Sequence, residues 1–235
     1  MPMYYYWDPT YILIVIGVIL SLMASFAVKS TFAKYNNVRN MRGLTGAEVA
    51  ERILHSQGIY DVGIGHISGN LTDHYDPRSK TLNLSDSTYS STSVAAVGVA
   101  AHECGHAIQH AKNYAPLSIR SALVPVANFG SSISWFLILI GLFISGSSGM
   151  FWINAGIIAF SAAVAFQLVT LPVEFNASRR ALAILKSNNI LAEEEVGKAR
   201  KVLTSAALTY VAAAAASILQ LLRLIILFGG RRDDD

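Results

Sequence analysis

The chain has little cysteine and little charge, and both scarcities limit what it can be. Cys104 is the one cysteine among 235 residues, so no intramolecular disulfide can form and a secreted disulfide scaffold is excluded. Charged residues make up 14% of the chain, against about 25% in an ordinary soluble domain, while hydrophobic residues make up 53%. Several apolar runs approach the 18 or so residues of a spanning helix, so a membrane protein is expected and a purely soluble enzyme is disfavoured.

Lys and Arg are absent from residues 1–10 and from the loop 145–150. Most of the 18 basic residues lie beside apolar runs, so membrane orientation explains the net charge of +3 better than a nucleic-acid partner does. Nine of them lie in 29–120 and six in 172–201, which predicts that both segments are cytoplasmic. The pair 231–232 opposes this pattern, because four spans would place it outside, although three aspartates follow it.

Four apolar segments are candidate spanning helices. The first, Tyr11–Val28, is uncharged; a cleaved signal peptide is the alternative, but residues 1–10 lack the basic residues of such a peptide. The segments 122–144 and 151–171, separated by a short uncharged loop, predict a membrane hairpin. The last segment, 204–222, is long enough to span, with a buried packing helix as the alternative.

Residues 29–116 have the composition of a folded polar domain. Thr45 and Glu48 form a capping box before a short amphipathic helix. Period-two alternation in Leu71–Tyr75 and Thr81–Leu84, on either side of a turn, predicts a β-hairpin. The free edge of this hairpin could bind an extended peptide, or be an ordinary sheet edge.

A helix predicted from Val94 to about Asn113 contains the H-E-x-x-H motif His102-Glu103-Cys104-Gly105-His106. Residues four apart lie on one helix face, so both imidazoles can bind one Zn²⁺ while Glu103 reaches the water on the metal. Zinc activates that water, Glu103 accepts its proton as general base, and the hydroxide attacks a polarised carbonyl. The motif therefore predicts peptide hydrolysis.

The other two residues of the motif predict packing rather than chemistry. Cys104 is turned about 200° from His102 around the helix and is expected to pack on the far side. Gly105 can let another backbone approach the helix closely.

A catalytic zinc site also needs a third protein ligand and an open position. Glu174 is the stronger candidate, because a carboxylate directly after the apolar segment 151–171 is most simply explained by a metal. His110 continues the four-residue spacing but drifts about 40° per step, so its alternative role is a contact near the helix end. Spacing singles out no oxyanion donor. The candidates are His66, His74, Tyr89, Tyr114, Arg179 and Arg180.

The chain resembles the neutral zinc metallopeptidases of bacterial membranes, the YugP-like group, over nearly its whole length. The first span and the segments 71–77, 93–109 and 172–181 carry the resemblance. More distantly, His-Glu-x-Gly-His followed by a membrane hairpin and Glu-Phe-x-Ala is similar to HtpX-type membrane proteases, in which the later glutamate is the third zinc ligand.

This resemblance implies a zinc site with assigned roles. One Zn²⁺ per chain would be held by His102, His106 and Glu174, with Glu103 as base. HtpX-type enzymes usually carry Asp where Ser178 stands, so a contact from this position to a zinc histidine stays open. Asn176 and Asp86 are the alternatives for that contact.

The predicted fold is a mainly α membrane protein with about four transmembrane helices and a small α+β, zincin-like cytoplasmic domain. The predicted function is a zinc metalloendopeptidase, gluzincin-like, in the bacterial cell membrane, with lipid and protein or peptide substrates as partners and an active site facing the cytoplasm. An intramembrane protease and a non-catalytic zinc-stabilised membrane scaffold are the alternatives. The parts are 1–28, the tail and first span; 29–116, the metallopeptidase domain; 117–171, the membrane hairpin; 172–203, the segment with the third ligand; and 204–235, the last span and tail.

Overall fold

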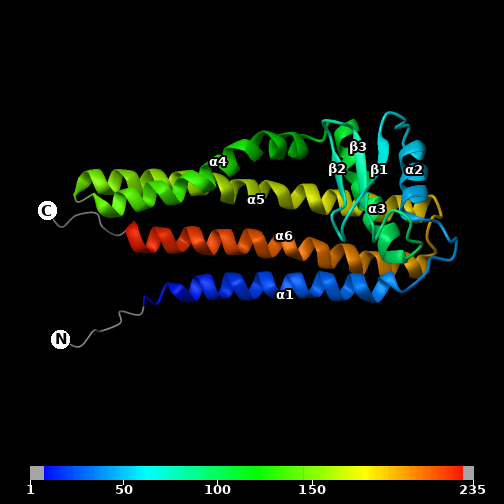
Figure 1. Cartoon of the computed structure of the whole chain (residues 1–235), viewed down its shortest axis with the longest axis horizontal. Helices are drawn as coiled ribbons and strands as arrows, with labels where there is room; N and C mark the ends of the chain where they lie inside the picture. Colours follow the sequence, from blue (N-terminus) through cyan, green and yellow to red (C-terminus); the bar gives the residue numbers. More distant parts are fainter. Residues whose placement is uncertain (1–7, 145, 230–235) are drawn as a thin grey trace. The chain divides into compact units, whose positions relative to one another are not determined.

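The structure is a computed structural model that describes residues 8–144 and 146–229. Within these ranges it is mainly helical, with one small sheet (Figure 1). The elements in chain order are α1 (Tyr11–Asn36), α2 (Gly46–Ser56), β1 (Gly63–Ile67), β2 (His74–Asp76), β3 (Thr81–Ser85), α3 (Val94–Ala111), α4 (Ala115–Phe143), α5 (Ser147–Ser187) and α6 (Glu193–Phe228).

The chain forms two compact units, each made of separate stretches of sequence. The helical unit comprises the described residues within Met1–Met23, Ile119–Val169 and Tyr210–Asp235. The α+β unit comprises Ala24–Ser118 and Thr170–Thr209, and it contains α2, α3 and the sheet. The helices α1, α4, α5 and α6 each contribute residues to both units.

Four helices, α1, α4, α5 and α6, are long and apolar enough to cross a membrane. The prediction of about four spanning helices is therefore confirmed by length and composition. In α6 only 17% of the most apolar window is buried, which favours a spanning helix over a buried packing helix.

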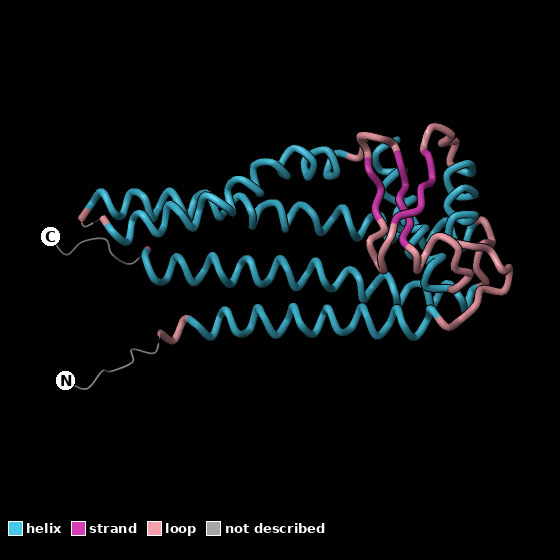
Figure 2. The backbone as a smooth tube through the Cα atoms, viewed as in Figure 1, coloured by secondary structure: helices cyan, strands magenta, loops and turns pink. Residues whose placement is uncertain are grey.

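In the helical unit, α4 and α5 form the predicted hairpin, joined by a short connection (Figure 2). A Cβ atom on Gly130 would lie 2.6 Å from the carbonyl oxygen of Ala159. A Cβ atom on Gly156 would lie 2.8 Å from the carbonyl oxygen of Ser134. Both glycines therefore allow the two backbones to approach more closely than larger residues would permit.

The same unit contains an ion pair between its first and last helical segments. Arg223 of α6 donates from Nη2 to Oδ2 of Asp8, just before α1, over 3.1 Å. Its guanidinium carbon lies 4.4 Å from the centroid of the Tyr11 ring. These contacts compensate a charge that would be costly in an otherwise apolar helix.

In the α+β unit the three strands have the order β1-β3-β2 (Figure 2). β2 pairs antiparallel with β3, which confirms the predicted hairpin, but β2 begins at His74 rather than at Leu71. Leu71 has a positive φ of 57°, which is incompatible with extended backbone. β1, which pairs parallel with β3, was not predicted from the sequence.

The helices α2 and α3 begin with the caps that the sequence indicates. The Thr45 hydroxyl accepts from Glu48 N, and the Glu48 carboxylate accepts from Thr45 N, which completes the capping box. Ser93 caps α3 by accepting a hydrogen bond from Ala96 N over 3.0 Å.

The core of the α+β unit surrounds α3, most of whose residues are buried. Cys104 lies on the side of α3 that faces α2, and its Sγ donates to the carbonyl oxygen of Ala50 over 3.6 Å. The predicted packing of Cys104 away from the two histidines is thus confirmed. Because α3 is enclosed by α2, the sheet and α5, its polar side chains have fixed surroundings.

Candidate metal centre

The approach of α5 to α3 depends on a glycine inside the H-E-x-x-H motif. A Cβ atom on Gly105 would lie 2.6 Å from the carbonyl oxygen of Ala177 and 3.0 Å from its Cα. Any larger residue would push the two helices apart. The predicted close approach at Gly105 is confirmed, and it brings the α5 residue Glu174, one turn before Ala177, beside the two histidines of α3.

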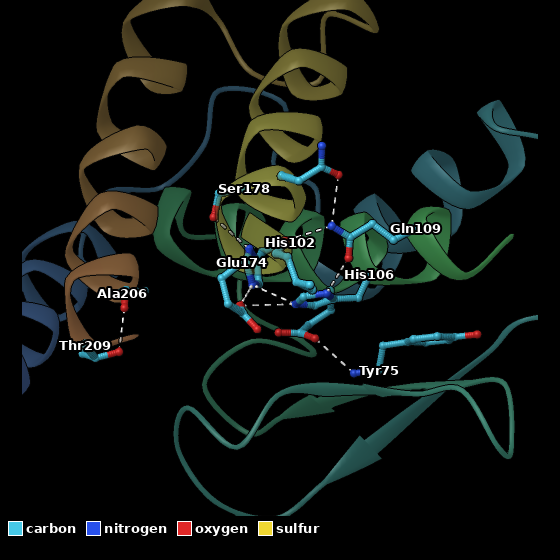
Figure 3. Close-up of polar contacts among 11 residues, drawn as sticks. Tyr75, His102, His106, Gln109, Glu174, Ser178, Ala206 and Thr209 are labelled. Carbon is cyan, nitrogen blue, oxygen red and sulfur yellow. Dashed lines mark hydrogen bonds and ion pairs between the residues drawn. The ribbon is translucent and has the colours of Figure 1, made fainter. Parts of the chain in front are cut away.

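Three potential ligand atoms meet between α3 and α5 (Figure 3). The Nε2 atoms of His102 and His106 lie 3.2 Å apart, and Oε2 of Glu174 lies 3.2 Å from the first and 3.4 Å from the second. Ligand atoms about 2.0–2.1 Å from a tetrahedral zinc ion are separated by about 3.3 Å. Two imidazoles and a carboxylate at this spacing fit Zn²⁺.

The ring nitrogens that face away from this cluster each have a side-chain partner (Figure 3). Nδ1 of His102 lies 3.0 Å from Oγ of Ser178, and Nδ1 of His106 lies 3.0 Å from Oε1 of Gln109. A neutral imidazole that offers Nε2 to a metal carries its proton on Nδ1, so both partners act as acceptors in that state. The contacts fix the ring orientations with both Nε2 atoms directed at one point.

Gln109 was not predicted from the sequence, although its side chain makes three hydrogen bonds in the site. It is fully buried, and its Nε2 donates to the carbonyl oxygen of Val173 over 2.8 Å and to Oδ1 of Asn176 over 3.0 Å. Arg180 in turn donates to Asn176 over 2.7 Å. A signal for Gln109 existed, since it follows His106 by three residues and thus shares its helix face.

Glu103 is held at the edge of the sheet. Its Oε2 accepts a hydrogen bond from the backbone nitrogen of Tyr75 in β2 over 3.0 Å, and the side chain is buried. This bond fixes the carboxylate between α3 and the edge strand. It also shows that β2, the outer strand of the hairpin, borders the site.

The electrostatics of the cluster favour an ionised carboxylate beside the imidazoles. Burial would lower the pKa of His106, but the hydrogen bond to Glu174 and the charge of Glu103 outweigh burial and raise it. Glu174 lies beyond the apolar segment that ends at Leu171. Burial would raise the pKa of Glu174, but the hydrogen bonds from His102 and His106 dominate and hold it well below its usual range.

Three further candidate residues named from the sequence are His110, His74 and Arg179. His110 is outside the three-ligand cluster, and its Nδ1 lies 2.8 Å from the hydroxyl of Tyr75. His74 contacts the Thr72 carbonyl oxygen and Asn83 on the exposed face of the sheet. Arg179 is exposed on α5.

The structure also shows which of the candidate side chains contacts a histidine of the proposed zinc site. Ser178 contacts His102 directly, and Asn176 reaches His106 only through Gln109. Asp86 instead pairs with His66 and accepts from Gly69 N.

The structure thus combines four helices that could span a membrane, a small sheet and a three-ligand cluster on an H-E-x-x-H helix. The chain belongs to the family described as "Putative neutral zinc metallopeptidase", which it matches over residues 10–229. It is 49% identical over 192 residues to a Bacillus subtilis protein described as "Putative membrane protease YugP", covering 82% of this chain and 84% of that protein. No solved structure matches the chain significantly.

Family membership and the cluster agree on the metal. Zinc is the cofactor of this family, and two imidazoles with a carboxylate form a donor set that suits it. The chain is thus a membrane protein of a zinc protease family, as the sequence predicted.

Proposed function

We propose that the chain is a zinc metalloendopeptidase in which His102, His106 and Glu174 hold the metal. The observation that carries this proposal is the nearly equal spacing of the three ligand atoms, 3.2, 3.2 and 3.4 Å, with the Nδ1 atoms of both histidines already hydrogen-bonded. Zinc bound there supplies a Lewis acid that polarises a peptide carbonyl and lowers the pKa of water.

The chain's own residues would supply proton transfer and substrate alignment. Glu103 would accept the proton of the attacking water and later deliver it to the leaving amine. The Tyr75 N–H would keep the Glu103 carboxylate oriented for both steps. The outer edge of β2 borders the site, so an extended peptide would lie beside it while the Tyr75 N–H stays bonded to Glu103.

The number of ligands argues against a structural zinc scaffold. A closed structural site uses four protein ligands, whereas a catalytic site uses three and leaves a position open. Among the residues that the structure describes, no fourth His, Cys, Asp or Glu joins the cluster.

We further propose that the site faces the cytoplasm at the membrane border. Glu174 follows the apolar segment 151–171 by three residues, and the segments 29–120 and 172–201 carry most of the positive charge. A metal at this level favours cleavage beside the bilayer over cleavage inside it.

The test compares the zinc-loaded chain with Glu103→Gln on an unfolded protein substrate in detergent. The variant is isosteric and leaves the three ligands intact, so it should retain one zinc per chain and lose activity by at least about a hundredfold. His106→Ala should lose zinc and activity together. If Glu103→Gln cleaves as fast as the unmodified chain, the proposed role of Glu103 is wrong.

A further inference from the structure

A cleft lies in the α+β unit, and none of its lining residues belongs to the zinc cluster. It lies between the C-terminal part of α1 and the N-terminal part of α6, with a volume of about 520 Å³. That volume is within the range of about 300–1,000 Å³ that is typical of small-molecule sites. Its polar walls are formed by Thr31, Lys34, Arg200, Lys201 and Thr204.

The charge of the cleft is of one sign. Lys34, Arg200 and Lys201 line it, and no carboxylate does. In the part of the chain that the structure describes, none of these three cations forms an ion pair. Two other basic residues of this region, Lys186 and Lys198, are by contrast paired with Glu193 and Glu194. The cleft therefore retains three positive charges available to an anion.

The walls of the cleft are fixed by core packing. Tyr35 lines it and is only 7% exposed, because its ring packs in a cluster with Phe32, Ala95 and Val202. The cluster joins α1 to α3 and α6. The ammonium of Lys34 lies 5.6 Å from the centroid of the Tyr35 ring. A rigid floor with cations at its rim is a preformed site, which reduces the entropy lost on binding.

The position of the cleft along its two helices corresponds to the membrane border. The apolar run of α1 ends at Val28, and that of α6 begins at Thr204. Ala27 and Leu208 line the apolar end of the cleft, while Lys34 lies beyond Val28 on the polar side. The cleft thus extends from the hydrocarbon boundary into the depth at which phospholipid headgroups lie.

We propose that this cleft binds the phosphate-bearing headgroup of an anionic phospholipid. The three cations neutralise the phosphate, the hydroxyls of Thr31 and Thr204 donate hydrogen bonds, and the acyl chains leave along the apolar side of Ala27 and Leu208. Basic pockets between helices at a membrane surface recognise anionic headgroups by this chemistry. The site is independent of peptidase activity.

The experiment titrates the full-length, zinc-loaded chain in detergent with short-chain phosphatidylglycerol and measures affinity by thermophoresis. The cleft variant Lys34→Gln with Arg200→Gln and Lys201→Gln should bind roughly 100-fold more weakly, since each cation near a headgroup contributes a factor of about five. A matched control removes three exposed cations outside the cleft, Lys29→Gln with Arg42→Gln and Lys112→Gln. The control should change affinity less than threefold.

A second variant guards against a folding defect of the triple variant. Thr204→Trp keeps all three cations, and its large side chain, at an exposed position of the lining, should fill the cleft. It should weaken lipid binding at least tenfold, while the zinc content stays at that of the unmodified chain. Two further arms use short-chain phosphatidylcholine and inorganic phosphate in place of the anionic lipid.

Selective binding of phosphatidylglycerol, lost in both cleft variants and kept in the control, supports the proposal. Equal loss in the control variant would mean general surface attraction and would overturn it. Equal affinity for phosphatidylcholine would overturn it too. Full competition by millimolar inorganic phosphate would identify a free-phosphate site and reject the lipid. If Thr204→Trp binds phosphatidylglycerol as tightly as the unmodified chain does, the lipid does not bind in the cleft.

Discussion

Ser178 contacts His102, one of the proposed zinc ligands, and restricts the orientation of its ring. Its Oγ lies 3.0 Å from Nδ1 of His102, on the opposite side of the ring from the cluster. Partners of this kind fix the tautomer and orientation of a metal-binding imidazole, and their loss typically lowers metal affinity about 10–100-fold. The Ser178 hydroxyl is placed to accept the Nδ1 proton of His102 while Nε2 faces the cluster.

We therefore expect Ser178→Ala to lower zinc affinity about 10–100-fold, measured by competition with a chromophoric chelator. Ser178→Asp should restore or raise the affinity, because a carboxylate accepts the Nδ1 proton more strongly. Ser187→Ala, in the last turn of α5, is the control and should leave zinc affinity unchanged. Equal affinities for the Ala and Asp variants would contradict the orienting role.

At this scale the sequence indicates the three proposed ligands but not all of the side chains that contact them. The spacing of His102 and His106 is a local helical property, so the motif alone places both imidazoles on one face. Gln109 was missed because its function depends on Val173, a partner 64 residues away. The role of His110 is likewise set by Tyr75, which only the folded hairpin brings to within 2.8 Å.

Among the elements, the contact of α3 with α5 has the strictest steric requirement. A Cβ atom at Gly105 would lie 2.6 Å from a backbone oxygen of α5, which cannot move without displacing Glu174. Gly98, two turns earlier on the same helix, faces Ala199 of α6 with 3.4 Å available to a Cβ atom. A methyl group at position 105 would therefore clash with α5, whereas one at position 98 would make an ordinary contact with α6.

We expect Gly105→Ala to lower the free energy of unfolding by about 1–3 kcal/mol and to weaken zinc binding, because overpacking separates the ligands. Gly98→Ala should be neutral or stabilise by up to about 1 kcal/mol through helix propensity. Thermal unfolding in detergent, followed by circular dichroism with and without zinc, distinguishes them. If the Gly105→Ala and Gly98→Ala chains are equally stable and bind zinc equally tightly, α3 and α5 can separate without loss of stability, and the expectation is wrong.

The sheet shows which elements sequence patterns can and cannot predict. The hairpin of β2 and β3 is local, and its turn is marked by Asp76, whose carboxylate accepts from Arg78 N and Ser79 Oγ. β1 has two glycines in five residues, a composition depleted in strands, and forms through parallel pairing with β3, from which β2 separates it in sequence. Such a strand depends on tertiary context, so the local pattern did not indicate it.

For the molecule as a whole, the positions of charged residues among the apolar helices affect both its stability and its orientation in the membrane. Arg223 is the one basic residue within the last apolar stretch, 204–228, and its side chain is 12% exposed. Its partner Asp8 comes from the other end of the chain. Removing one member of such a pair leaves the other charge without compensation.

Asp8→Asn should therefore lower the free energy of unfolding, since the Arg223 guanidinium loses its ionised acceptor. Arg223→Gln should also destabilise, but the double variant Asp8→Asn with Arg223→Gln should be less destabilised than the sum of the two, which a double-mutant cycle in detergent measures. Strict additivity would show that the two side chains do not interact.

The distribution of positive charge predicts the orientation of the chain in the membrane. The segment 29–120 carries nine basic residues, and the loop 145–150 carries none, so the former should be cytoplasmic and the latter external. Single cysteines at two exposed positions test this, Lys112→Cys just after α3 and Ser148→Cys at the start of α5. The unmodified chain is a suitable background, because Cys104 is fully buried and burial raises the pKa of its thiol well above the usual value.

In intact cells a membrane-impermeant maleimide should label Ser148→Cys and not Lys112→Cys, while permeabilised cells should show labelling of both. The unmodified chain should stay unlabelled until it is unfolded. Labelling of Lys112→Cys from outside would place the proposed zinc site on the opposite side of the membrane from the cytoplasm. The peptidase assay would be unaffected by that outcome, because the three ligands and Glu103 keep their geometry whichever way the chain is inserted.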